Sequence, residues 1–147
     1  MNNYIEKKIE LNASVSRVWK ALTDFEEFGQ WFRVKFEEPF VINHTCRGRL
    51  TYPDYEHYVI EIVVQKMEPE HLFSFTWHPY ALDNKRDYSK EDPTLVEFHL
   101  EKIDTGTRLI VTESGFNNLP KDRRIEAFQM NNDGWEEQMK NIKNYIE

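Results

Sequence analysis

The spacing of apolar residues is helical in two short stretches near the start of the chain. Before them, Tyr4–Leu11 alternates apolar and charged residues, as a half-buried strand does. Apolar side chains then recur three and four positions apart within residues 15–22, and Phe25, Phe28 and Phe32 continue this spacing. The pattern therefore predicts one strand followed by two short amphipathic helices.

Between Val34 and Ser114 the apolar residues alternate with polar ones, which is the period of strands. Turn signals divide this region, and Asp104–Gly106 is the strongest hairpin signal among them. Six strands are expected, near Val34–Phe40, Gly48–Tyr52, Tyr58–Met67, Leu72–His78, Thr94–Ile103 and Thr107–Ser114.

The helical spacing returns after Pro120, where Trp135, Met139, Ile142 and Ile146 follow one another at i, i+4, i+7 and i+11. A run of strands followed by one long helix, without βαβ alternation, is typical of an α+β fold with an antiparallel sheet. We expect a curved sheet of six to seven strands wrapped around this C-terminal helix, in a single domain over residues 1–147.

Size and charge limit the classes of protein that remain. The chain has 147 residues, the length of one ordinary domain, and 14% of them are aromatic, so large rings supply most of the buried surface. Its 19 basic and 26 acidic residues give a formal net charge of -7, which does not favour nucleic-acid binding.

The start of the chain is charged and has no apolar signal-peptide core, and no apolar run is long enough to span a membrane. With the single cysteine, Cys46, this favours a cytoplasmic protein, either a monomer or a weak dimer. The histidines and Cys46 form no metal-binding spacing, and no nucleophile-elbow or phosphate-loop motif is present, so neither a metal nor another cofactor is expected.

The alternation of the strands sorts their residues onto two faces of the sheet. One face collects rings and branched side chains, and a single helix about 10 Å across does not cover the full width of such a sheet. We therefore expect space between the sheet and the helix.

Two polar residues fall on the predicted inner face. Glu113 shares its parity with Leu109 and Val111; it either lies at a strand end and reaches solvent, or it is a cavity acid that orients or protonates a ligand. Asn131 precedes Trp135 by four positions on the apolar stripe. It either lies at a frayed helix end or is a polar group inside the cavity.

A long loop, Pro79–Pro93, mixes charged residues with tyrosines between two expected strands. Most loops of this kind are simply solvated, and the functional alternative is a mobile lip over a cavity mouth.

Four segments in order carry a resemblance to a known family: SVSRVWKALTDFEEFGQWF, MEPEHLFSFTW, VEFHLEKIDTGTRLIVTESGF and NNDGWEEQMKNIKNYI. Together they resemble the activator of heat-shock-protein-90 ATPase homologue-like group of the START-like, helix-grip superfamily. The resemblance implies a seven-stranded antiparallel sheet gripping the C-terminal helix, with a cavity between them. It also suggests that Gly134 lets the helix approach its neighbours closely while Trp135 closes the cavity floor.

The leading functional hypothesis is a binding module for a small apolar, aromatic or lipid-like ligand in that cavity. One alternative is a cyclase-type or hydrolase-type enzyme that uses Glu113 with a second titratable group. Another is an interaction module for a chaperone or other protein partner, which predicts a filled interior and a contiguous exposed apolar or acidic surface. The expected ligand-binding residues are Phe36, Tyr52, Tyr58, Phe75, Trp77, Phe98, Glu113, Asn131, Trp135 and Met139.

Overall fold

A computed structural model describes residues 4–81, 83 and 85–147, so that residues 82 and 84 of the long loop lie outside the described part. Its elements in chain order are β1 (Tyr4–Leu11), α1 (Val15–Thr23), α2 (Phe25–Phe32), β2 (Val34–Phe36), β3 (Thr45–Leu50), β4 (Val59–Glu68), β5 (Leu72–Trp77), β6 (Thr94–Ile103), β7 (Gly106–Ser114), a 3-10 turn (Phe116–Asn118) and α3 (Lys121–Ile146).

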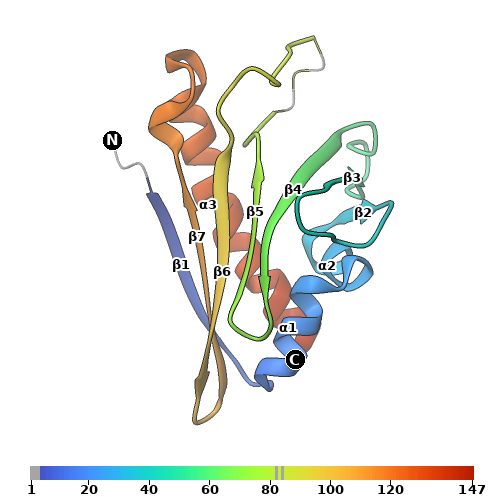
Figure 1. Ribbon diagram of the computed structural model, residues 1–147, viewed down its shortest axis with the longest axis vertical. Helices are drawn as coiled ribbons and strands as arrows, with labels where there is room; N and C mark the ends of the chain where they lie inside the picture. The colour runs from blue at the N-terminus through green and yellow to red at the C-terminus, as the bar shows by residue number, and fades with distance from the viewer. Residues whose placement is uncertain (1–3, 82, 84) are drawn as a thin grey trace.

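The seven strands form one antiparallel sheet in the order β1-β7-β6-β5-β4-β3-β2. Consecutive strands from β2 to β7 are neighbours, and β1 joins the free side of β7, with Ile5 opposite Glu113. Figure 1 shows α3 running obliquely across one face of this sheet, with α1 and α2 packed at the end where α3 finishes. The predicted α+β, helix-grip architecture is confirmed.

Side-chain caps set the ends of the two short helices. Ser14 accepts a hydrogen bond from the Arg17 amide at the start of α1, and Asp24 accepts bonds from the amides of Glu26 and Glu27 at the start of α2. Such caps satisfy amides that have no partner inside the helix. Arg33 ends α2 in the left-handed region, with φ 68°, and the chain then enters β2.

Aromatic side chains of α2 fill the space that we expected between the sheet and α3. The Phe28 ring lies 6.3 Å from the Phe73 ring, 6.4 Å from Phe75 and 6.3 Å from Phe98, centroid to centroid. All four side chains are buried. The width of α3 alone does not fill the sheet, and the rings of α2 supply the rest of the core.

Two strands differ from their expected bounds by more than one residue. β2 ends at Phe36, and β3 begins at Thr45, earlier than expected, because the chain turns at Asn43 with φ 67°. The Asn43 amide donates to the Val64 carbonyl at 2.7 Å, which directs the following residues alongside β4.

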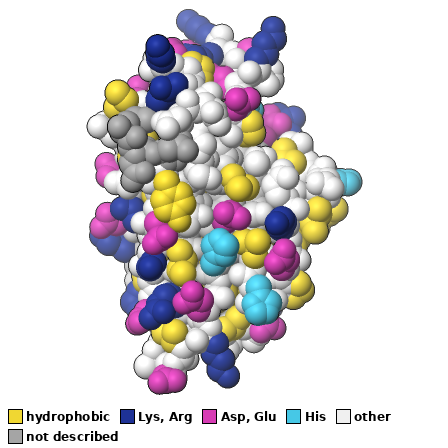
Figure 2. Space-filling model, turned by 60° about the vertical axis from the view of Figure 1, so that its left-hand side comes forward, with side chains coloured by type: hydrophobic (Ala, Val, Ile, Leu, Met, Phe, Trp, Pro, Cys, Tyr) yellow, Lys and Arg dark blue, Asp and Glu magenta, His cyan; other side chains and the backbone are white. Residues whose placement is uncertain are grey.

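The outer surface mixes charges of both signs. On the face shown in Figure 2, acidic and basic side chains are interspersed, without an extended area of one sign. Among the described residues, no helix is long and apolar enough to cross a membrane.

Candidate functional site: a cleft between β4, β5 and α3

A half-open cleft of about 580 Å³ lies where β4, the end of β5 and the middle of α3 approach one another. Its walls come from β4, from the β5–β6 loop (residues 78–93) and from one face of α3. The hollow opens to solvent on one side, so the cavity implied by the resemblance takes the form of a cleft.

The cleft exists because β4 and β5 separate. β5 pairs with β4 only over Val63–Glu68, whereas Val59–Ile62 pairs with β3 alone. Figure 1 shows the two strands diverging toward this end of the sheet. Pro79 follows the last residues of β5 and has no amide hydrogen to donate to a neighbouring strand, which favours ending the pairing here.

Three aromatic rings form the apolar inner end of the cleft. Phe32 lies 5.9 Å from Trp77 and 5.8 Å from Trp135, and the two indoles are 5.8 Å apart, centroid to centroid. All three residues line the cleft. Because they come from α2, β5 and α3, this aromatic surface forms only when the three elements pack together.

Gly134 lies beside these rings on the cleft-facing side of α3. A Cβ atom built on it meets no atom within 4 Å among the described residues. The prediction that this glycine permits a close helix approach is therefore wrong. Its absent side chain instead leaves open space in the cleft.

Beneath the aromatic rings lies a buried carboxylate with four hydrogen-bond donors. Glu113 Oε2 accepts from Trp77 Nε1 at 2.7 Å and from Thr94 Oγ1 at 2.5 Å. Its Oε1 accepts from Asn131 Nδ2 at 2.9 Å and from Trp135 Nε1 at 2.8 Å. The exposed fraction of Glu113 is 0%, so its carboxylate has lost its hydrating water. The four donors supply the hydrogen bonds that water would otherwise make.

The expected alternatives for Glu113 and Asn131 can now be compared with their positions. Glu113 does not reach solvent, because side chains of β5, β6 and α3 surround both of its carboxylate oxygens. Asn131 is not at a frayed end but lies well inside α3, where its amide contacts Glu113. Both residues are therefore placed to hold the indoles that line the cleft.

Thr94 is a member of this cluster that the sequence analysis did not identify. It is the first residue of β6 and is fully buried, opposite Trp77 in the register. Its parity matches that of Val96 and Phe98 on the inner face, which is the signal that was available in the sequence.

The β5–β6 loop is fastened to α3 by a buried ion pair. Arg123, in the first turn of α3, donates to Glu91 from Nε at 3.0 Å and from Nη2 at 2.9 Å. The same guanidinium donates to the carbonyls of Pro79 and Tyr80 at the other end of the loop. The exposed fractions of the Arg123 and Glu91 side chains are 8% and 7%, so this contact closes the base of the loop inside the protein.

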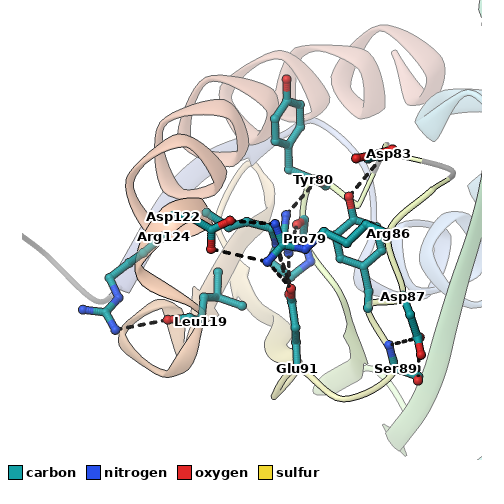
Figure 3. Close-up of polar contacts among 12 residues, drawn as sticks. Pro79, Tyr80, Asp83, Arg86, Asp87, Ser89, Glu91, Leu119, Asp122 and Arg124 are labelled. Atoms are coloured by element: carbon teal, nitrogen blue, oxygen red, sulfur yellow. Dashed lines mark hydrogen bonds and ion pairs between the residues drawn. The ribbon is translucent and has the colours of Figure 1, made fainter.

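A second arginine extends the contact toward the surface. Arg86 donates to Asp122 at 2.7 Å and lies 3.1 Å from Glu91. The Tyr88 ring lies under Arg123, whose guanidinium carbon is 4.6 Å from the ring centroid. Figure 3 shows the loop and the start of α3 meeting at these side chains. The mobile-lip hypothesis therefore applies only to the part of the loop beyond this base.

Polar groups of the loop border the outer part of the cleft. Burial and the neighbouring Glu126 carboxylate raise the pKa of the Tyr80 phenol. Hydrogen bonds from the Ser89 hydroxyl and amide lower the pKa of Asp87. His78 also lines the cleft, and its buried Nδ1 has no hydrogen-bond partner among the described residues.

The ten expected ligand-binding residues occupy three kinds of position. Trp77, Asn131 and Trp135 line the cleft, and Glu113 lies directly behind them. The remaining six do not line it. Those that pack in the closed aromatic core or beside it are Phe36, Phe75, Phe98 and Met139.

The other two, Tyr52 and Tyr58, lie in or next to the turn between β3 and β4. Tyr52 is exposed beside Arg33, and Tyr58 stacks on Tyr55 with 5.8 Å between the ring centroids. Strand parity placed Phe75, Phe98 and Glu113 on the inner face, where they are buried, but it does not distinguish a filled core from a cleft. Within the described residues, no group of three or more His, Cys, Asp or Glu side chains is arranged to hold a metal ion.

Comparison with known proteins agrees with this architecture. The sequence model of the family described as Activator of Hsp90 ATPase homolog 1-like protein matches residues 12–147. No curated protein matches the chain.

Solved structures with the same arrangement are distant in sequence. A Mesorhizobium loti protein is 22% identical, with 97% of this chain and 96% of that chain covered and a TM-score of 0.76. An Arthrobacter aurescens protein is 17% identical, with 98% and 86% covered and a TM-score of 0.78. DynU16, from the dynemicin biosynthetic locus, is 21% identical over 99% of this chain but only 48% of its own, with a TM-score of 0.75. At these identities the likeness shows the fold alone.

Proposed function

The chain belongs to the family of Activator of Hsp90 ATPase homolog 1-like proteins, and we propose that it is a binding module for a small, largely apolar aromatic or lipid-like molecule. Proteins of this fold typically bind hydrophobic ligands. The observation that carries the proposal is the half-open cleft of about 580 Å³ with Phe32, Trp77 and Trp135 at its inner end. Its volume lies in the range of small-molecule sites.

The hydrogen bonds behind the cleft support the same function. Glu113 fixes both indoles through their Nε1 atoms, so the aromatic surface is held in place before a ligand arrives. Such preorganisation lowers the entropy cost of binding. In this role Glu113 positions the walls of the site and does not contact the ligand itself.

The two alternatives receive less support. The enzyme hypothesis required a second titratable group bonded to Glu113, but its four donors are two indoles, a hydroxyl and an amide. The interaction hypothesis required a filled interior and one contiguous exposed apolar or acidic surface. The aromatic core is filled, but acidic and basic side chains are interspersed on the face shown in Figure 2. The exposed Val41 and Ile42 precede β3, whereas Tyr52 and Tyr55 follow it, so about 20 Å of strand separates the two pairs.

The test is native mass spectrometry of freshly purified protein, followed by a thermal-shift screen of fatty acids, isoprenoids, flavonoids and aromatic acids. A ligand at 100 times its Kd stabilises the folded state by about 2.7 kcal/mol. Gly134→Leu fills the cleft, and Gly134→Ala is the matched control with a smaller side chain. In the wild type and in Gly134→Ala we expect either a co-purified ligand in the mass spectrum or a melting temperature that rises saturably with ligand concentration. Gly134→Leu should show neither. No shift across the panel, or an equal shift in Gly134→Leu, would refute the proposal.

A further inference from the structure

The outer half of the cleft is bordered by a strand edge that has no pairing partner among the described residues. Main-chain groups of Tyr58 and Val64 bond toward the β3 side: the Leu50 amide donates to the Tyr58 carbonyl at 3.1 Å and the Asn43 amide to the Val64 carbonyl at 2.7 Å. In an antiparallel pair, successive residues direct their main-chain groups to opposite sides. Val59 and Glu61 therefore direct their N–H and C=O groups away from β3.

The side to which Val59 and Glu61 point is the cleft. β5 pairs with β4 no further than Val63 opposite Thr76, and both Val59 and Glu61 line the cleft. Continuing the register by two residues would place His78 opposite Glu61, but the strands have separated there. The cleft thus occupies the place that the next pair of ladder hydrogen bonds would have filled.

The residue that would have completed this pair, His78, has a ring nitrogen without a hydrogen bond among the described residues. His78 lines the cleft, and this nitrogen, Nδ1, is buried. Buried polar groups are nearly always paired, and an unpaired one calls for an explanation. A ligand group between Glu61 and His78 supplies that explanation, because it would bond to the strand edge and to the imidazole together.

The charges around the cleft restrict what this ligand group can be. Glu61 and Asp87 contribute carboxylates to its lining, whereas the Arg86 guanidinium is already bonded to Asp122 at 2.7 Å and paired with Glu91 at 3.1 Å. An anionic group would therefore meet uncompensated like charge. A cationic group would find acceptors but would leave the Glu61 N–H unbonded.

We propose that the ligand carries a neutral carboxamide, which bonds the β4 edge at Glu61 and the His78 imidazole while its aromatic or apolar body lies against Trp77 and Trp135. A carboxamide has both a donor and an acceptor, as a strand edge requires. This inference rests on the proposed function, because it names the polar end of a ligand for the same cleft.

The experiment uses four naphthalene probes of one shape: 2-methylnaphthalene, 2-naphthamide, 2-naphthoate and 2-naphthylmethylammonium. Each is titrated by tryptophan fluorescence into the wild type. We expect 2-naphthamide to bind about tenfold more tightly than the methyl compound, the typical effect of one well-formed hydrogen bond. If the methyl, carboxylate or ammonium probe binds as tightly as the amide, the inference is overturned although the cleft binds ligands. If none of the four binds while a compound of the thermal-shift panel does, the inference is overturned and the proposed function stands. If neither the probes nor the panel bind, the proposed function itself fails.

Two variants assign the preference to the named groups. Glu61→Pro removes the N–H that faces the cleft and no hydrogen bond to β3, and Glu61→Ala is its control because it removes only the side chain. His78→Phe removes the imidazole nitrogens and keeps a ring. We expect both Glu61→Pro and His78→Phe to lose the amide preference, while Glu61→Ala keeps it. His78→Phe decides the matter alone if Glu61→Pro does not fold, and an amide preference unchanged in His78→Phe would overturn the inference.

Discussion

The indole Nε1 of Trp135 donates a hydrogen bond to Glu113 Oε1 at 2.8 Å, which joins the middle of α3 to the C-terminal end of β7. Through Oε2 the same carboxylate binds the indole of Trp77 on β5. One buried acid therefore fixes the two rings that form the inner end of the cleft. The central features of the site, its shape and its apolar surface, depend on this pair of contacts.

Replacing Glu113 by Gln tests the importance of the buried carboxylate. Either amide orientation places an NH2 group opposite one indole N–H, which cannot accept, so at least one of the four hydrogen bonds is lost and that indole is left buried without its acceptor. We expect the free energy of unfolding to fall by about 2–4 kcal/mol, measured by urea denaturation. Glu97→Gln is the control, because its side chain is half-buried on the outer face of the sheet. Equal effects of the two substitutions would contradict the account.

Two glycines test the packing around α2 and α3. A Cβ atom at Gly29 would lie 2.2 Å from the Val34 carbonyl oxygen, whereas one at Gly134 meets nothing within 4 Å. Gly134→Ala should raise the free energy of unfolding by up to about 1 kcal/mol through helix propensity. Gly29→Ala should lower it, because the helix must move away from β2. Thermal unfolding of both variants checks this, and destabilisation by Gly134→Ala would be inconsistent with an open cleft.

The buried ion pair at the base of the loop should be costly to break from one side. Arg123→Met leaves the carboxylate of Glu91 buried with only Arg86 beside it, and we expect a loss of about 3 kcal/mol in unfolding free energy. The double variant Arg123→Met, Glu91→Leu should recover most of this loss, since no charge is left unpaired. Lys121→Met, on an exposed residue of the same turn, should change little. A double variant as unstable as Arg123→Met would show that the pair itself is not the cause.

Acid should weaken the outer contact of this loop. Hydrogen bonding from Arg86 lowers the pKa of Asp122 below its ordinary value. Its contribution to stability is therefore fully present above that ordinary value, near 4, and is lost as the pH falls through the lower folded pKa. The difference in melting temperature between the wild type and Asp122→Asn should shrink toward zero as the pH is lowered below about 4. A difference independent of pH would contradict this assignment.

The fold could be predicted from the sequence to a large extent because period and parity are local signals. Trp135 and Met139 on α3, and Glu113 on β7, were assigned to the inner face, and the structure places them there. The closed core was missed because it depends on where α2 packs. Phe28 reaches across the sheet to Phe73, a contact that no local pattern reports.

The cleft was harder to predict, since it depends on two strands separating. The paired stretch of β4 and β5 ends at Val63 and Thr76, and the only local sign was Pro79 just beyond. Arg123 was also missed, although it lies four residues before the buried Ala127, on the same side of α3. A charged residue at such a position indicates a buried partner, and the partner is Glu91.

The most direct test of the binding site is the response of the four indole N–H signals in a proton–nitrogen NMR spectrum when 2-naphthamide is added. The chain has four tryptophans, so each signal can be assigned with a single substitution. Trp77 and Trp135 line the cleft, whereas Trp31 donates to the Ala21 carbonyl inside the core and Trp19 lies on α1. The account predicts saturable shifts of the Trp77 and Trp135 signals with those of Trp19 and Trp31 unmoved. Shifts confined to Trp19 or Trp31, or no shift at any of the four, would contradict it.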